Sequence, residues 1–319
     1  MNQEIFDACY EEWKLDRKNV KYWEKLGRRF DKNPEALRNW FKRERKKRGI
    51  FRGIQKSSSG IYIEDKPRIG IFDIETLPMV AYVWRMFDQN ISLDQVISET
   101  GLLSWAAKFL NESEIYSDIL TSKEAPLKDS KRIAKSCWDF LSKCDVVIGH
   151  NVMSFDLKHM NTFFLKYGLS PLKYVIVDTL SVARNNFNFD SNKLKFINQK
   201  LNIKQKIDNS GFELWRDCHQ GKQTALDTML EYNIGDIYST EELFYKVRPY
   251  VRNFNVALYN ETLTNQCPVC GSTDLKSEGF YYTPAGKWES VRCQECKCIS
   301  RKKQNLFDKH KKRSLLINS

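Results

Sequence analysis

The feature that most constrains this chain is a set of four cysteines arranged as two pairs, Cys267 with Cys270 and Cys293 with Cys296. Two residues separate the cysteines within each pair, the spacing that brings four thiolates around one Zn²⁺ ion as a tetrahedron. Four thiolates leave no open coordination position, so we expect a structural rather than a catalytic zinc. Cys298 competes for the last position, but the spacing within the second pair favours Cys296.

The segment between the two pairs predicts a β-hairpin, with strands at 280–283 and 287–292 around a Pro-Ala-Gly turn. A ribbon of this size cannot fold on a hydrophobic core alone, so metal binding would supply much of its folding free energy. We therefore expect a four-cysteine zinc ribbon at 262–303 and a basic tail at 304–319. The number of cysteines, nine, is odd, and the N-terminal residues show no signal-peptide pattern. Both observations argue against a disulfide framework.

Alternating strand and helix patterns occupy residues 68–255. The apolar run IGIFDI at 69–74 opens this region, and further strands are expected at 80–86, 102–109, 115–120, 146–148 and 174–177. Helices are expected at 131–143, 155–167, 193–201 and 225–247. Three early strands followed by mixed strand and helix units predict an α/β domain whose sheet begins antiparallel and continues parallel.

Three groups of acidic and polar residues lie at the ends of these elements. Asp73 and Glu75 are two apart on the first strand, so both side chains leave the same face. Asp156 ends the stretch GHNVMSFD and begins a helix, and Tyr232 and Asp236 are four apart on another helix. Adjacent carboxylates are costly unless a cation such as Mg²⁺ or Mn²⁺ neutralises them. Alone, each group has an ordinary alternative: solvated acids, a helix cap or a core tyrosine.

Taken in order, FDIET, NxxxFD and YxxxD resemble the motifs of the DEDDy family of 3′–5′ exonucleases, which includes the proofreading domains of family B DNA polymerases. The stretches VDTL, SNKL and GFELW resemble this family as well, and the three-module layout resembles that of phage-type exonucleases. The resemblance covers about residues 68–250. It implies a ribonuclease H-like mixed sheet flanked by helices and a metal-dependent exonuclease with a two-metal-ion mechanism.

The resemblance also implies roles for single residues. Two Mg²⁺ or Mn²⁺ ions would be held by Asp73, Glu75, Asp156 and Asp236, with Tyr232 orienting the attacking water. The histidine variant of the family would place its base at position 231, which is Glu231 here, so the tyrosine subclass is favoured.

Contacts to the terminal nucleotide are expected from Asn151 and Phe155, although Phe155 could equally be a core residue of its helix. We assign no chemistry to His150. The separation of Asp73 from Asp156 is longer than a compact core requires, which indicates an irregular loop in 84–130 that could cover the substrate groove.

Residues 1–50 predict a small helical domain, and the Gly/Ser-rich, basic stretch at 51–67 predicts a linker. Helices at 20–30 and 34–48, joined by a short turn, resemble a helix-turn-helix whose second helix enters the major groove of DNA. Candidate nucleic-acid contacts on that helix are Arg38, Asn39, Lys42, Arg43, Arg45 and Lys46. The alternative is a solvated basic helix in a small bundle.

The net charge of +12 is concentrated at the two ends of the chain: residues 1–56 carry 17 basic and 9 acidic side chains, and residues 301–319 carry 7 and 1. Such basic ends favour a nucleic acid as partner, DNA rather than RNA because of the helix-turn-helix. The alternatives are the same chemistry on RNA, an endonuclease, or a DNA-binding regulator whose nuclease fold is inactive. No apolar run could span a membrane, so we expect a cytoplasmic protein (host cytoplasm if phage-encoded). Protein partners are not indicated.

Overall fold

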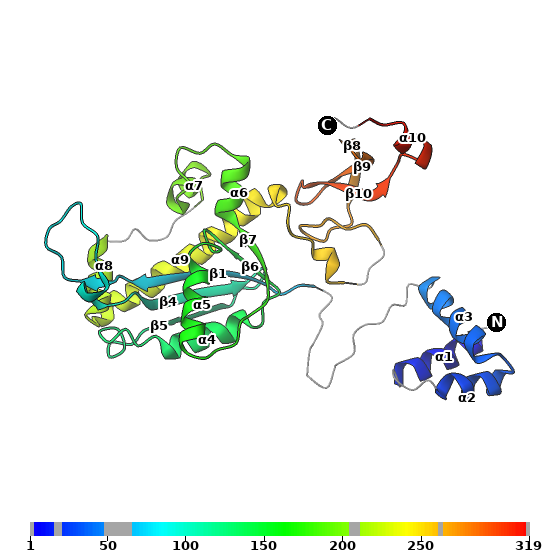
Figure 1. Ribbon diagram of the computed structural model, residues 1–319, viewed down its shortest axis with the longest axis horizontal. Helices are drawn as coiled ribbons and strands as arrows, with labels where there is room; N and C mark the ends of the chain where they lie inside the picture. Colours follow the sequence, from blue (N-terminus) through cyan, green and yellow to red (C-terminus); the bar gives the residue numbers. More distant parts are fainter. Residues whose placement is uncertain (1–2, 16–20, 48–65, 204–210, 261–263, 317–319) are drawn as a thin grey trace. The chain divides into compact units, whose positions relative to one another are not determined.

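The computed structural model describes residues 3–15, 21–47, 66–203, 211–260 and 264–316 (Figure 1). The chain divides into two compact units, residues 1–65 with 258–264 and residues 66–257 with 265–319. The second unit contains both the predicted α/β region and the cysteine-bearing segment. Among the described helices, none is long and apolar enough to cross a membrane.

The first unit contains three helices, α1 (Gln3–Leu15), α2 (Lys21–Phe30) and α3 (Pro34–Lys47). The two helices predicted in this region are α2 and α3. The side chain of Asn33 caps α3 by accepting hydrogen bonds from the next turn at 3.0 and 3.1 Å. The helices enclose a small core of Phe6, Cys9, Trp23, Leu26, Leu37 and Phe41.

A five-stranded mixed sheet forms the centre of the second unit. Its strands are β1 (Ile69–Leu77), β4 (Gly101–Phe109), β5 (Ile115–Ile119), β6 (Val146–Gly149) and β7 (Val175–Asp178), in the spatial order β5-β4-β1-β6-β7. The β5-β4 and β4-β1 pairs are antiparallel, whereas the β1-β6 and β6-β7 pairs are parallel. The predicted change from antiparallel to parallel pairing is therefore confirmed, and these five strands begin and end close to the predicted residues.

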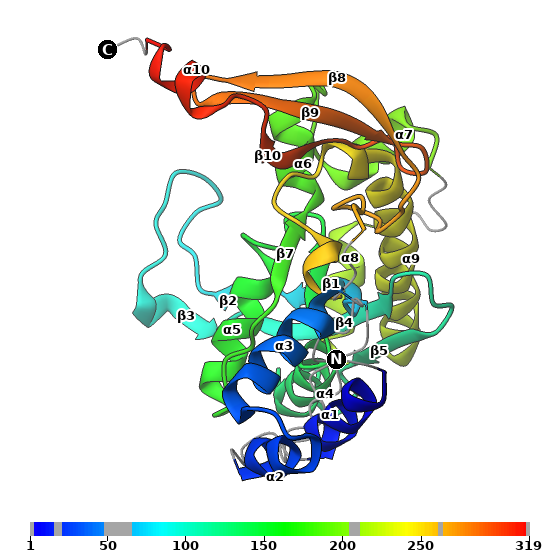
Figure 2. The same ribbon diagram turned by 90° about the vertical axis from the view of Figure 1, so that its right-hand side faces the viewer.

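Helices cover both faces of this sheet. They are α4 (Lys131–Leu141), α5 (Asp156–Lys166), α6 (Thr179–Asn186), α7 (Leu194–Lys200), α8 (Phe212–His219) and α9 (Gln223–Val247), with single turns at Leu93–Gln95, Arg248–Tyr250 and Val256–Leu258. Neighbouring residues of β4 reach opposite layers: Trp105 donates to Ser136 of α4, and Ser104 donates to Asn233 of α9. Figure 2 shows α9 on one side of the sheet and α5 on the other. Both layers are needed to bury β4 along its whole length.

The prediction of a strand at 80–86 is wrong. Only Val80–Ala81 (β2) is extended, and it pairs with Val96–Ser98 (β3) in a separate two-stranded ribbon. Pro78 follows the last residue of β1, where its missing N–H ends the ladder, so the chain leaves the sheet. The loop between β2 and β3 projects from the domain (Figures 1 and 2).

Within 84–130, the strands predicted at 102–109 and 115–120 are present as β4 and β5. Residues 82–95, between β2 and β3, are irregular apart from the single turn Leu93–Gln95, and we call them the 82–95 loop. Its apolar side chains are unusually open to solvent, with Tyr82, Trp84 and Phe87 exposed by 74, 93 and 75%.

The cysteine-bearing segment forms a three-stranded antiparallel sheet of β8 (Leu275–Thr283), β9 (Gly286–Cys293) and β10 (Ile299–Asn305), in the order β10-β9-β8. The predicted hairpin is confirmed as β8 and β9, with longer strands than expected. The third strand was not predicted. It extends beyond residue 303, so the predicted tail begins inside a strand, and a short helix, α10 (Lys309–Arg313), follows it.

Candidate active site

Carboxylates from β1 and α9 meet on one face of the sheet. Asp73, Glu75 and Asp236 each place an oxygen within 4.8 Å of the others. Phe72 and Ile74, which alternate with the two acids of β1, are buried, as the two-residue period of a strand predicts. Folding therefore brings together acids that lie far apart in the sequence.

Asp156 is buried beside this group, with 3% of its surface exposed. It is the first residue of α5, and its Oδ1 accepts a hydrogen bond from the backbone N–H of Ile74 at 3.0 Å. The bond ties the start of α5 to the strand that carries the other acids. The cap position of this helix belongs to Phe155, so the helix-cap alternative for Asp156 is excluded.

Tyr232 faces the same acids from α9. It is half-buried one turn before Asp236, and its hydroxyl lies beside that carboxylate. Its ring lies 6.4 Å from the ring of Trp215, at an interplanar angle of 71°. Burial, followed by the charges of the neighbouring acids, raises the pKa of the hydroxyl, which keeps it protonated at neutral pH. The adjacent Glu231 is exposed to solvent.

Each of the four acids has a pKa above that of an ordinary carboxylic acid. Burial is the largest cause and raises the pKa of Glu75 to about 8, of Asp156 to about 7 and of Asp236 to about 6. Burial and then the charges of the other three acids raise the pKa of Asp73 well above its ordinary value, against the hydrogen bond that it accepts from Asn233. Clustered carboxylate oxygens that need a positive charge fit the ligand preference of Mg²⁺ or Mn²⁺.

Two residues that hold these acids in place were not singled out from the sequence. The buried Asn233 donates from Nδ2 to Asp73 Oδ2 at 2.7 Å, and its Oδ1 accepts from the hydroxyl of Ser104 at 3.0 Å. The side chain of Trp215 lies beside Glu75 and lowers its pKa, against the larger effect of burial. The stretch GFELW contains Trp215 and was a usable signal, whereas nothing in the local sequence distinguishes Asn233 from other polar residues of a helix.

The loop between β6 and α5 is shaped by close packing. A Cβ atom on Gly149 would lie 2.6 Å from the Cβ of Val152 and 2.8 Å from the carbonyl oxygen of Phe72, so only glycine fits. Asn151 adopts a left-handed backbone conformation with φ of 66°, and its N–H donates to Asp178 Oδ1 at 3.0 Å. The asparagine thereby starts the turn that leads into α5.

Phe155 lies on the surface of this loop, 39% exposed, with its ring 4.6 Å from that of His159 in an edge-on contact. The expectation that Phe155 could be a core residue is therefore wrong. The ring nitrogens of His150 hydrogen-bond to the hydroxyl of Thr179 and the carbonyl of Asn192, both at 2.9 Å. This histidine holds the loop, in line with our assigning it no chemistry.

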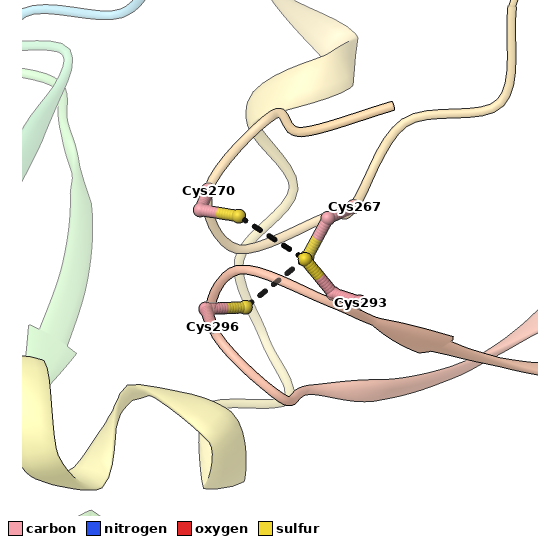
Figure 3. Close-up of side chains that lie close together, drawn as sticks. All are labelled: Cys267, Cys270, Cys293 and Cys296. Atoms are coloured by element: carbon pink, nitrogen blue, oxygen red, sulfur yellow. Dashed lines mark hydrogen bonds between the residues drawn. The ribbon is translucent and has the colours of Figure 1, made fainter. Parts of the chain in front are cut away.

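The second candidate metal site is in the ribbon. The sulfur atoms of Cys267, Cys270, Cys293 and Cys296 all lie within 4.8 Å of one another, and Figure 3 shows the four side chains converging. The Cys267–Cys296 and Cys270–Cys293 sulfur pairs are 3.4 and 3.6 Å apart. Four Zn–S bonds of about 2.3 Å in a tetrahedron require sulfurs about 3.8 Å apart, so this cluster fits zinc.

The two cysteine pairs are presented by equivalent turns. The residue after each pair, Gly271 or Lys297, is left-handed, with φ of 78° and 64°. In each turn this residue donates its N–H to the carbonyl of the first cysteine, at 2.9 and 3.1 Å. Cys298 is not one of the four converging cysteines, and its sulfur contacts the Ser300 hydroxyl at 3.7 Å. The geometry therefore supports the predicted choice of Cys296.

The candidate contacts on α3 point to solvent where the structure describes their side chains. These are Arg38, Asn39, Lys42 and Arg43. The side chains of Arg45 and Lys46 lie outside the described residues. That α3 reads DNA remains a prediction.

Comparison with known proteins identifies the central region. Residues 103–248 match the sequence profile of the RNase H superfamily. This match covers a little less than half of the chain. The matched residues include Asp156, Tyr232 and Asp236. Asp73 and Glu75 lie on β1, before the match begins. The ribonuclease H-like fold that the sequence predicted is thus confirmed; the DEDDy subclass and the likeness to phage-type exonucleases remain predictions.

Two polymerases resemble parts of this chain. Over 122 residues it is 30% identical to the DNA polymerase III PolC-type of Pediococcus pentosaceus, a match that spans 36% of this chain and 8% of the polymerase. The family B DNA polymerase of the archaeon Pyrobaculum calidifontis aligns with a TM-score of 0.43 and 16% identity, over 62% of this chain and 27% of that one. The chain therefore spans only a small part of either polymerase.

Proposed function

We propose that this protein is a metal-dependent 3′–5′ exonuclease that hydrolyses the phosphodiester bonds of DNA. The observation that carries the proposal is the convergence of Asp73, Glu75, Asp156 and Asp236, each with a raised pKa that a cation would relieve. The RNase H superfamily domain supports nucleic-acid hydrolysis. The orientation of Tyr232 toward the acids supports the DEDDy subclass.

The acids divide into two sets of metal ligands. Asp73, Glu75 and Asp236 would hold one ion, and Asp73 would share a second with Asp156. Divalent ions held by these acids would neutralise the scissile phosphate, activate water and stabilise the leaving oxygen. Asn233 fixes the rotamer of Asp73 through its 2.7 Å hydrogen bond, so the shared ligand is oriented before any ion binds.

Tyr232 would orient the attacking water. A hydroxyl whose pKa is raised stays protonated, so it acts through positioning and not as a general base. The exposed ring of Phe155 offers a stacking surface for the terminal base, and Asn151 lies in the same loop. Exposed Arg38 and Lys42 on α3 supply charge for the DNA backbone.

The test is mononucleotide release by the full-length protein from 3′-labelled and 5′-labelled single-stranded DNA, from recessed duplex DNA and from matched RNA, with Mg²⁺ or Mn²⁺. We expect early loss of the 3′ label and no activity in Asp73→Asn/Glu75→Gln. Asp227→Asn is the matched control, because this acid lies on the exposed side of α9, and it should behave as wild type.

Each alternative has its own result in this assay. Preferential degradation of RNA would show that the substrate is RNA and not DNA. Cleavage of circular single-stranded DNA would indicate an endonuclease. If the wild-type protein and Asp73→Asn/Glu75→Gln are equally inert but bind duplex DNA tightly, the protein is a binding factor and the proposed enzyme is wrong.

A further inference from the structure

The outer strand of the ribbon exposes three consecutive aromatic residues. Phe280, Tyr281 and Tyr282 are 51, 49 and 62% exposed. They belong to β8, an edge strand whose residues from Lys276 to Tyr282 are all exposed. None of them is a zinc ligand, and their side chains stay exposed although their backbones pair with β9, which is typical of a surface that binds a partner.

Cations are interleaved with these rings on both faces of the sheet. On one face, Lys287 pairs across the strands with Tyr282 and places its ammonium 3.6 Å from the Phe280 ring centre and 5.7 Å from that of Tyr282. On the other, Arg301 lies 4.4 Å from the Trp288 ring centre and 5.7 Å from that of Tyr281. Rings and cations together provide the two contacts that a nucleic-acid strand needs, stacking for bases and charge for phosphates.

The charge balance of the ribbon also favours a polyanion. Residues 264–316 carry 11 lysines and arginines against 5 aspartates and glutamates. Two of those acids are already neutralised in ion pairs, Glu278 with Arg292 at 2.6 Å and Glu289 with Lys302 at 2.8 Å. The acids of the sheet therefore do not offset Lys287 and Arg301. An apolar protein partner would not explain this excess of positive charge.

We propose that the face formed by Phe280, Tyr282 and Lys287 binds single-stranded nucleic acid, with bases stacked on the two rings and Lys287 against the backbone. The two rings lie 6.5 Å apart at an interplanar angle of 64°, so each offers a separate π face. Paired bases are stacked inside a duplex and cannot reach such rings, which makes the site selective for unpaired strands. The proposal concerns binding alone and stands or falls independently of hydrolysis.

The test is fluorescence anisotropy of labelled oligothymidylate with the full-length, zinc-loaded protein in buffer without Mg²⁺ or Mn²⁺. Removing one stacked base contact costs about 1–3 kcal/mol, so Phe280→Ala or Tyr282→Ala should weaken binding about 5- to 150-fold. Affinity for a duplex of equal length should change less than about twofold. Ile299→Ala is the matched control, since it removes an exposed apolar side chain from the same sheet, and it should bind as wild type.

Salt dependence separates the two kinds of contact. Lys287→Gln should lower the slope of log affinity against log salt by about 0.7, the value for one phosphate on a single strand, whereas the ring variants should leave the slope unchanged. An oligonucleotide carrying 5-iododeoxyuridine should photocrosslink to the peptide containing Phe280 and Tyr282. Zinc content and circular dichroism must match wild type in every variant compared.

Three results would overturn the proposal: ring variants that bind oligothymidylate as wild type does, equal losses for single strands and duplex, or crosslinks confined to other peptides. A protein partner on this edge gives a different result. If Phe280→Ala/Tyr282→Ala abolishes self-association in sedimentation while single-strand affinity is unchanged, the face pairs copies of the chain and does not bind nucleic acid.

Discussion

Replacing Asp236 by asparagine should stabilise the protein in the absence of Mg²⁺ and Mn²⁺, although it destroys a metal ligand. Burial raises the pKa of Asp236 from 3.8 to about 6. A raised pKa means that the folded state binds the proton more tightly, so the favourable contribution of the protonated acid is complete below about pH 4 and is lost as pH rises through 6. Two pKa units correspond to about 3 kcal/mol. Asparagine avoids this cost and keeps a polar side chain of the same shape beside Tyr232.

The expected gain at pH 8 is about 2–3 kcal/mol, discounted because the neighbouring acids titrate together. For a unit of this size that corresponds to an increase in Tm of about 4–10 °C. The gain should fall to about 1 kcal/mol at pH 4.5 and vanish only below about pH 4, where aspartate is protonated in the unfolded chain as well. Added Mn²⁺ should reverse the order, since it stabilises wild type by binding its folded state and the variant much less.

Differential scanning calorimetry at several pH values, with zinc retained and no chelator, measures this effect. Asp227→Asn on the exposed side of α9 is the control and should show no pH-dependent difference. The reasoning would be refuted by an Asp236→Asn protein that is less stable than wild type at pH 8 without Mn²⁺, or by a stability difference that stays constant from pH 4.5 to 8.

Four further substitutions test the sites separately. Cys296→Ser should abolish zinc binding, whereas Cys298→Ser should retain full zinc content by elemental analysis; equal loss in both would show that the ligand is misassigned. Gly149→Ala should destabilise the second unit by about 1–3 kcal/mol in denaturant unfolding, because a Cβ does not fit there. Asn233→Leu should lower kcat about 10- to 100-fold with little change in KM, since it frees the rotamer of Asp73; a wild-type kcat would exclude a positioning role.

Hydrophobic runs made the strands of the central sheet predictable. The same kind of run led to the wrong prediction of a strand at 80–86. The strand VVIG of β6 and the buried strand β4 are apolar because helices cover both faces. The stretch YVWRMF at 82–87 is also apolar and aromatic, yet β1 has already ended at Leu77 and these residues join no strand of the central sheet. Local composition cannot report whether a partner strand is present, so the 82–95 loop was assigned partly to a strand.

The ligands of the candidate site were easier to predict than their supports. Asp73, Glu75 and Asp236 carry charges at diagnostic spacings, and the structure brings them within 4.8 Å. Asn233 is buried because it bridges Asp73 and Ser104, a role set by tertiary packing. The short helices α6 and α8 were missed for a related reason, since eight residues show too little periodicity.

The long helix α9 supplies Tyr232, Asn233 and Asp236 from a single rigid element of 25 residues. One inserted residue upstream of Tyr232 within α9 would rotate all three by about 100° and carry them off the sheet together. An insertion in the 82–95 loop would displace none of them. Homologous chains should therefore vary in length at that loop. They should have no insertion within α9 that changes which of its residues face β1.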